Sequence, residues 1–497
     1  MNRYVKYILL ICFCLTEEDF PFDPEDVSET SQEFELTDIS QQPYKSRIRF
    51  VPNSLSKEWH FHQLFQHKMF TVGVRIDENK TDDKFDISRL FLSKGTKNYS
   101  IILGSIKAEF GQGLVFSNEF GKFKSYSSIM PISKNHDVFK ANLNSKTQSS
   151  IEGIALQFDT KTLHNKILIT QGNRVVESNN SKNNIYAYYI KKELQTCNIG
   201  FIFAKETVSY KSTYQNYYSG IFSKQFENIK VNGEVVFSKY STAYIINCSS
   251  KTEEFHWLIQ KRHLPTNWSN ITGIPFTEFK KGKNEKGILF YCQYKEERLI
   301  IGATIDVFSE IRSEENLSKN FGYDKRIMIS YNINELVKLE IRHKQKRTNN
   351  EQQNIQFGVS HSYFAPILKR TSEAVVKIPQ NNGFIFKYKL LEYCPNIEKK
   401  EKGRLITISF PKLFIKEWRI TSCIRWFSTD SWDSRLYAYV PGLSGEFPIK
   451  TFYGKGWQSF LKCEYGLSTQ TDVSFRGSCE WKNEPLITFA IQMDVNL

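Results

Sequence analysis

The sequence lacks any hydrophobic run long enough to cross a bilayer as a helix. Its one uninterrupted apolar core, Tyr7 to Leu15, follows Arg3 and Lys6. A transmembrane helix needs about 20 apolar residues, whereas a short apolar core behind basic residues is typical of a secretory signal. We therefore expect residues 1–16 to be a signal peptide, and a membrane location would depend on strands.

C-x-x-C pairs and catalytic motifs are also missing. Two of the nine cysteines lie in the apolar run at 12 and 14, and the other seven are scattered without a C-x-x-C pair. Zinc sites and small disulfide scaffolds require such spacing, so neither is expected. There is no P-loop and no nucleophile elbow. The sequence therefore predicts no enzymatic activity, no catalytic residue, no cofactor and no metal site.

The sequence has more basic than acidic residues. The net charge of +14 favours an anionic partner such as a lipid surface, lipopolysaccharide or nucleic acid, although a generally Lys-rich surface gives the same total. No Lys/Arg cluster has the density of a nucleic-acid patch, so direct binding of nucleic acid is not expected.

Capped amphipathic helices, βαβ units and repeats of 20–50 residues are absent, and short alternating segments run from about residue 46 to the end. In TDVSFRGSCEW (471–481), Phe475 shares a face with Val473, while Arg476 and Glu480 lie on the other. The segments 337–342, 229–238 and 486–497 alternate in the same way. A period of two over this length predicts strands with one apolar and one polar face.

Two architectures have such strands, a soluble antiparallel sandwich and a transmembrane barrel. The segments are near ten residues long, and tight turns such as 330–337 alternate with long polar connections such as 309–324 and 364–382. An open sheet of this size would also leave exposed edges. We therefore expect an all-β, antiparallel up-and-down transmembrane β-barrel of roughly 16–22 strands.

Three stretches resemble a family of large outer-membrane β-barrels of Gram-negative bacteria that share an FGQGL strand motif. The first is NYSIILGSIKAEFGQGLVFSNEFGK (98–122), the second is a loop ending in Asn-Glu-Lys-Gly (284–287), and the third is SRLYAY (434–439) followed by YGKG (453–456). The resemblance spans about residues 46–497. It implies structural roles for these motif residues: Gly104, Phe110, Gly111, Gln112, Gly113, Arg435, Tyr437, Tyr439 and Gly454.

Members of that family often carry N-terminal helix-hairpin-helix repeats of the competence DNA-binding type. This sequence has no such repeat, so the implied DNA binding does not carry over. Val440 stands where the family has an acidic residue, and the chain ends in Asn-Leu rather than in an aromatic residue.

The expected organisation is a signal peptide (1–16), an acidic flexible leader (17–45) and the barrel (46–497). Within the barrel, residues 117–150 lose all periodicity after the glycines of the first motif. They form either a plug folded into the lumen or a long outer loop. The candidate lumen-lining residues are Lys338, Glu340, Arg342, Arg476, Glu480 and Asp494.

The expected location is the Gram-negative outer membrane. There the barrel would act as a channel or as a component of a transport or secretion assembly. Two alternatives stay open: a plugged, non-conducting structural or accessory barrel that works through a partner complex, and a secreted all-β binding protein. The expected partners are outer-membrane lipid and lipopolysaccharide, the barrel-assembly machinery, and secretion or uptake proteins.

Overall fold

The computed structural model describes residues 44–496 except 53–56, 68, 79–84, 97, 118–121, 123, 125–129, 134, 144–149, 174–181, 209–212, 280–281, 312–319, 357–358, 379–382, 396–398, 416, 444–448 and 483. The expected signal peptide and nearly all of the acidic leader therefore lie outside the described residues. Within the described part, no helix is long and apolar enough to cross a membrane.

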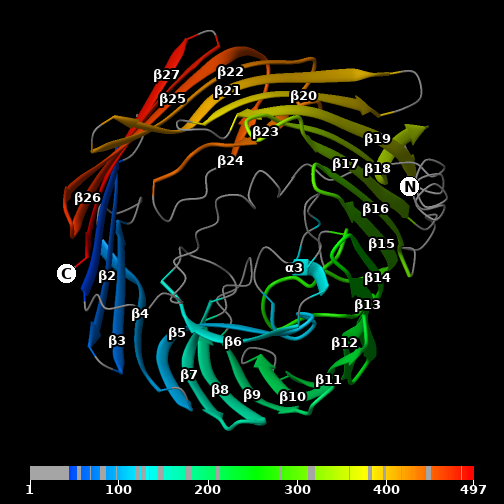
Figure 1. Ribbon diagram of the computed structural model, residues 1–497. Helices are drawn as coiled ribbons and strands as arrows, with labels where there is room; N and C mark the ends of the chain where they lie inside the picture. The colour runs from blue at the N-terminus through cyan, green and yellow to red at the C-terminus, as the bar shows by residue number, and fades with distance from the viewer. Residues whose placement is uncertain are drawn as a thin grey trace.

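The chain forms a closed antiparallel barrel of 24 strands, seen along its axis in Figure 1. Each wall strand pairs with the next along the chain, and the first and last strands, β1 and β27, close the ring through Lys45–Phe50 and Ile491–Asn496. The wall strands are β1 Tyr44–Pro52, β2 Lys57–His67, β3 Phe70–Glu78, β4 Phe85–Gly95, β5 Tyr99–Gly111, β7 Ser150–Asp159, β8 Leu163–Asn173, β9 Lys182–Glu193, β10 Cys197–Val208, β11 Thr213–Phe226, β12 Ile229–Ser238, β13 Ser241–Lys251, β14 Phe255–Leu264, β15 Glu285–Lys295, β16 Leu299–Ser309, β17 Phe321–Asn332, β18 Lys338–Gln356, β19 Val359–Ile378, β20 Phe384–Cys394, β21 Glu401–Ile415, β22 Trp418–Thr429, β25 Lys455–Ser468, β26 Thr471–Trp481 and β27 Pro485–Asn496.

The barrel confirms the expected fold class, but its strand number lies above the expected range of 16–22. Several turns are so tight that the alternation runs through them without a break. Between β12 and β13, for example, only Lys239 and Tyr240 separate the paired residues Ser238 and Ser241. A two-residue turn leaves the period-two pattern unbroken, so the pattern does not show where one strand ends and the next begins.

The expected polar connection at 364–382 is also wrong, because residues 359–378 are strand β19. Lys369, Thr371, Glu373 and Lys377 occupy alternate positions there, and this face of the strand looks inward. A strand that lines a polar lumen can carry this much charge. Its composition is then typical of a loop, which explains the wrong prediction.

The two faces of the wall differ in polarity as lipid and lumen require. On β26 and β27, Phe475 and Ile491 are 39% and 43% exposed, while the neighbouring Ser474 and Gln492 are 3% and 0% exposed. Outward apolar side chains that remain exposed have no protein to pack against. A closed ring with such an outer face is a transmembrane β-barrel of the outer-membrane type, because every backbone pair is satisfied within the ring.

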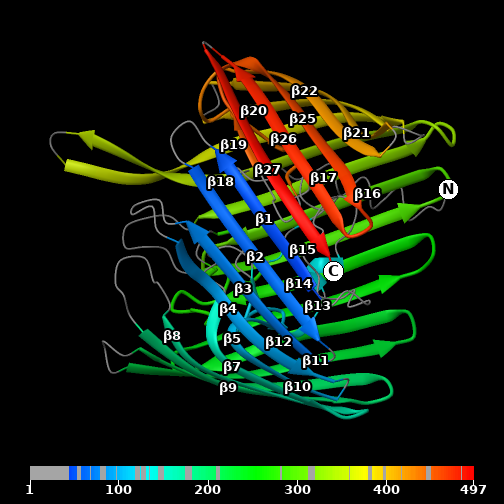
Figure 2. The ribbon, with the colours of Figure 1, turned by 90° about the vertical axis from the view of Figure 1, so that its left-hand side faces the viewer.

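The two ends of the barrel also differ, as Figure 2 shows. Short turns such as 227–228, 252–254 and 296–298 lie at one end, together with the start of β1 and the end of β27. We call this the short-turn end. The other end carries the long connections, and there the β18–β19 hairpin extends beyond the neighbouring strands. In outer-membrane barrels short turns face the periplasm.

Three of the long connections fold back into the ring (Figure 1). The first, 112–149, contains the short helix α3 (Met130–Ser133) and strand β6 (His136–Ala141), which pairs with β5. The second is 265–284. The third, 430–454, contains the hairpin of β23 (Leu436–Tyr439) and β24 (Ile449–Phe452). We call them the first, second and third inward loops, and each carries or adjoins one of the family-like motifs.

Candidate functional site in the barrel lumen

The FGQGL motif forms a turn held by a carboxylate of another wall strand, β12, which lies six strands further round the ring. Glu234 on β12 accepts hydrogen bonds at Oε2 from the backbone N–H groups of Gln112 (2.7 Å) and Leu114 (3.1 Å). Gly111 has a φ of 55°, and a Cβ there would lie 2.7 Å from that same Oε2. Only glycine allows both the left-handed backbone and the close approach of the carboxylate.

Two further glycines of this stretch also have a left-handed backbone, Gly113 in the same turn and Gly104 within β5, where it pairs with Phe91 of β4. Gly113 has a φ of 86°, and Gly104 has a φ of 99° with the carbonyl oxygen of Leu90 only 2.2 Å from where a Cβ would stand. Phe110 anchors the turn by stacking on Tyr189 with ring centroids 4.7 Å apart. β5 therefore bends inward at its end and directs the first inward loop into the lumen.

Gln112 and Lys122 tie this turn to α3. The buried Gln112 side chain donates from Nε2 to the carbonyl oxygen of Ser133 (3.3 Å), and its Oε1 accepts from Lys122 Nζ at 2.9 Å. Lys122 Nζ also donates to the carbonyl oxygen of Ile132. Burial lowers the pKa of Lys122 to about 7, although the carboxylates of Glu234 and Glu109 oppose that shift. The motif glutamine thus connects the loop to its own helix.

A buried ion-pair cluster fixes the first and second inward loops to the wall. Lys124 Nζ lies 2.6 Å from Glu278 of the second inward loop, 3.1 Å from Asp306 on β16 and 2.8 Å from Asp324 on β17. All four side chains are at most 7% exposed. Burial alone would lower the pKa of Lys124, but the three carboxylates outweigh it and raise that pKa.

Three further cations complete the cluster. Arg262 on β14 bonds Asp306 at 2.8 Å, Arg326 bonds Asp324 at 3.2 Å, and Lys346 on β18 lies 2.9 Å from Glu278. Burial would raise the pKa of Glu278, but Lys124 and Lys346 hold it well below its usual range. Arg326 also donates to the backbone oxygen of Lys124 at 2.8 Å. Each buried charge therefore meets charge of the opposite sign, as the low dielectric of such a site demands.

The Asn-Glu-Lys-Gly motif supports this cluster. Glu285 accepts the backbone N–H groups of Glu278 (2.8 Å) and Phe279 (2.7 Å) at Oε2, and its Oε1 accepts from Arg262. A Cβ at Gly287 would lie 2.5 Å from Arg262 Cζ, so this glycine leaves room for the guanidinium. The motif closes the second inward loop around Arg262.

The third motif forms the third inward loop. Arg435 donates to Tyr437 Oη at 2.6 Å and to the carbonyl oxygen of Trp432 at 2.8 Å. The backbone oxygen of Tyr439 accepts from Arg425 on β22 at 2.6 Å. Gly454 has a φ of 82° where β24 leads back to the wall. These contacts place the β23–β24 hairpin against the inner face of β20–β22.

Ion pairs on the inner face involve the candidate lumen-lining residues Lys338, Glu340, Arg342, Glu480 and Asp494. Glu340 contacts Lys338 (3.0 Å) and Arg342 (2.7 Å), and Asp494 contacts Arg47 (2.5 Å). Glu480 pairs with Lys450 of β24 and with Lys482. The structure therefore brings together three of the six candidates, namely Lys338, Glu340 and Arg342. Glu480, Arg476 and Asp494 lie in other parts of the wall.

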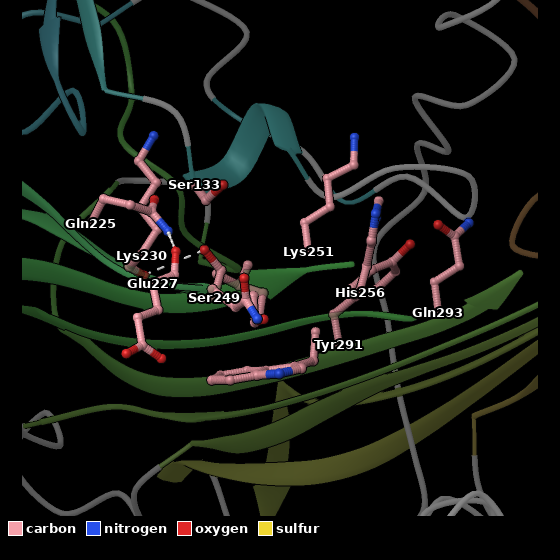
Figure 3. Close-up of a pocket in the computed structure, with 13 residues that line it drawn as sticks. Ser133, Gln225, Glu227, Lys230, Ser249, Lys251, His256, Tyr291 and Gln293 are labelled. Carbon is pink, nitrogen blue, oxygen red and sulfur yellow. Dashed lines mark hydrogen bonds between the residues drawn. The ribbon is translucent and has the colours of Figure 1, made fainter. Parts of the chain in front are cut away.

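A cavity of about 290 Å³ lies at the short-turn end of the lumen, beneath α3. Figure 3 shows Lys251, His256 and Gln293 rising into it from the wall and Ser133 above it. The cavity is open to solvent, and polar side chains line it together with Trp257, Leu258 and Tyr291. Among the described residues, no group of three or more His, Cys, Asp or Glu side chains is placed to hold a metal ion.

Sequence reasoning missed the ion-pair cluster. The available signal was a charge inside an otherwise apolar strand segment, as at Asp306 in LIIGATIDVF (299–308). On a barrel strand such a residue must face inward, because charge on the lipid face is too costly. Its partner Lys124 lies in a stretch without periodicity, so nothing in the sequence pattern connects the two.

No protein-family model matches the sequence, and no curated protein matches it. Solved structures that are similar include the ferric enterobactin receptor of Pseudomonas aeruginosa (7% identity, TM-score 0.47) and a siderophore receptor of Acinetobacter baumannii (6%, 0.47), each covering 91% of this chain and 80% of its own. A copper transporter has 6% identity and a TM-score of 0.48, covering 92% and 80%. Similarity at this level transfers neither ligand nor activity, and the barrel assignment depends on the strand pairing of this chain alone.

Proposed function

We propose that the protein is a non-enzymatic transport barrel of the outer membrane whose three inward loops obstruct the lumen, and which conducts or exports cargo only together with a partner. The observation that carries this proposal is the buried cluster that joins the first inward loop to the second and to five neighbouring wall strands, β14 to β18.

The width of the ring explains why the inward loops matter. A strand spacing of about 4.8 Å and a tilt of about 40° give 24 strands a backbone diameter of roughly 48 Å. An empty lumen of that size would make the outer membrane leaky to large solutes. The loops that enter this lumen are fixed by well-paired buried charges, which argues for a stable obstruction.

Two of the functions expected from the sequence, an open channel and a plugged barrel, differ in what they require of the inward loops. An open channel requires the inward loops to leave a continuous passage. A plugged barrel requires them to stay in place without a partner. The tight cluster supports the second, with transport regained when a partner moves the first inward loop. The resemblance to the FGQGL family supports a location in the outer membrane. It does not indicate which ligand or cargo the barrel would carry.

The test is conductance with and without proteins that co-purify from outer membranes. The purified barrel alone should insert into planar bilayers, give a heat-modifiable band on gels and show small or no conductance steps. Addition of the co-purifying partner should produce larger steps. Large, stable steps from the barrel alone would show that it is an open channel and would contradict the proposal.

A further inference from the structure

The outer face of β10–β15 carries basic side chains and no acidic ones. Exposed apolar residues such as Phe201 (59%) and Phe237 (55%) identify the outward positions of these strands. At those positions, all of which the structure describes, the sequence has no Asp or Glu. The basic residues that alternate outward include four lysines: Lys205, Lys224, Lys261 and Lys286. The positive charge on this face is therefore not balanced by a carboxylate of the same face.

Most of these lysines lie near the end of the barrel that carries the long connections. β10 and β14 run toward that end, and Lys205 and Lys261 stand in their last four residues. β15 starts from the same end with Lys286 as its second residue. Lys239 joins them from the two-residue turn between β12 and β13. We call Lys205, Lys239, Lys261 and Lys286 the basic rim.

Tyrosines accompany two lysines of the basic rim. Lys205 Nζ lies 5.1 Å from the ring centre of Tyr214, and Lys239 Nζ lies 5.1 Å from that of Tyr240. Tyr214 also interacts electrostatically with Lys239, so the two pairs adjoin. A ring face attracts an ammonium group but leaves its charge uncompensated. Among the described residues, no carboxylate forms an ion pair with Lys205 or Lys239.

The two pairs lie at the edge of the apolar outer face. Phe203 precedes Lys205 by two residues, Phe237 precedes Lys239 by two, and these rings are 41% and 55% exposed. A lysine is costly at the middle of the bilayer and tolerated near its surface, which is also the depth that tyrosine prefers. The basic rim therefore lies at the level of the lipid headgroups.

Charge distinguishes this end of the strands from the other end. Three short turns at the opposite end, 227–228, 252–254 and 296–298, together hold five glutamates and one arginine. Short turns face the periplasm in outer-membrane barrels, so the basic rim faces the outer leaflet. In Gram-negative bacteria that leaflet consists of lipopolysaccharide, whose lipid A carries phosphate groups.

We propose that the basic rim binds the phosphate groups of lipid A, with the pairs Lys205–Tyr214 and Lys239–Tyr240 as the principal contacts. The ammonium groups donate charge-assisted hydrogen bonds to the phosphate oxygens. The acyl chains of the same lipid lie on the exposed apolar side chains next to the rim. This inference concerns the outer surface only, so it does not depend on whether the inward loops obstruct the lumen.

Native mass spectrometry of the full chain in a non-ionic detergent, titrated with bisphosphorylated lipid A, tests the proposal. Lys205→Gln with Lys239→Gln should weaken binding at least tenfold, since each cation near an anionic lipid surface contributes about fivefold. Lys205→Arg with Lys239→Arg should bind as the unaltered protein does, because both charges are kept. The heat-modifiable band checks folding of each variant.

Lys224→Gln is the matched control. Lys224 also faces outward and lies 4.6 Å from the ring centre of Phe226, but it belongs to the short-turn end of β11. This variant should bind lipid A as the unaltered protein does. An equal loss in Lys224→Gln would show that total charge alone drives binding. That result, or unchanged binding in the double glutamine variant, would overturn the proposal.

Two further ligands separate the lipid headgroup from other sources of phosphate chemistry. Lipid A without its phosphates should bind the unaltered protein at least tenfold more weakly than the bisphosphorylated form. Inorganic phosphate, added at constant ionic strength, should not displace bound lipid A, because the acyl chains also contribute to binding. Equal binding of the two lipids would show that the acyl chains alone are recognised. Displacement by inorganic phosphate would show a site for free phosphate, and either result would overturn the proposal.

Discussion

Replacing Lys124 with glutamine should release the first inward loop without unfolding the barrel. The substitution removes a cation that touches three carboxylates, Glu278, Asp306 and Asp324, each at most 7% exposed. Breaking a buried pair from one side costs about 3–5 kcal/mol. Each carboxylate keeps a second cation, so we take about 3 kcal/mol, the lower end of that range. That is a factor of about 150 in the equilibrium between docked and released loop.

The assay is hydrogen exchange of the backbone amides of residues 130–133 and 136–141 in detergent or vesicles, with the heat-modifiable band as the control for barrel folding. Exchange of 130–133 should accelerate by about two orders of magnitude, while the wall strands keep their protection. Lys124→Arg should retain most of the protection because it keeps the charge. Lys124→Gln combined with Glu278→Gln should recover part of it, since one unpaired carboxylate is removed. Unchanged exchange in Lys124→Gln would refute the idea that this cluster holds the loop.

Four further outcomes are expected. Gly111→Ala should loosen the first inward loop, because the φ of 55° and the 2.7 Å approach of Glu234 both exclude a Cβ. Gly220→Ala, with open space around it, should have no effect. The rate of protease cleavage within residues 112–149 measures the difference between the two variants. Phe475→Lys on the outer face should destabilise the barrel by roughly 2–4 kcal/mol in urea refolding into vesicles, and Thr488→Lys on the inner face should have a smaller effect. The pKa of Lys122 is lowered to about 7 in the folded protein, so the unfolded chain binds more protons above that pH. The protection of the first inward loop against hydrogen exchange should therefore rise between pH 7 and about 10. This rise should vanish in Lys122→Met. In a conducting form the basic lumen should favour anions over cations at low salt, and reversal potentials under a KCl gradient would show a cation preference if the surplus charge lay elsewhere.

The sequence alone predicted the wall better than the interior, and the reason is physical. Period-two alternation is a local signal, so Phe475 against Arg476 or Ile341 against Arg342 could be assigned to opposite faces without any tertiary information. The prediction of strand boundaries was wrong where a turn such as Lys239-Tyr240 preserves the alternation. The prediction was also wrong for β19, because its inward-facing charged residues give it a composition typical of a loop.

The interior could not be predicted because its contacts join residues far apart in the chain. Glu234 meets Gln112 across 122 residues, and Lys124 meets Asp306 across 182. No periodicity encodes such pairs. The family-like motifs marked the right segments, since Gly111, Glu285 and Gly454 all sit where an inward loop leaves or rejoins the wall. Their partners became visible only in the fold.

The most direct test of the central claim is the single-channel conductance of a barrel in which residues 118–134 are replaced by a short Gly/Ser linker. This change removes Lys122, Lys124 and α3 but keeps the FGQGL turn and the β5–β6 pairing. If the inward loops obstruct the lumen, the variant should retain its heat-modifiable band and conduct several-fold more than the unaltered protein in the same bilayer. Equal conductance, with the band intact in both, would contradict the account.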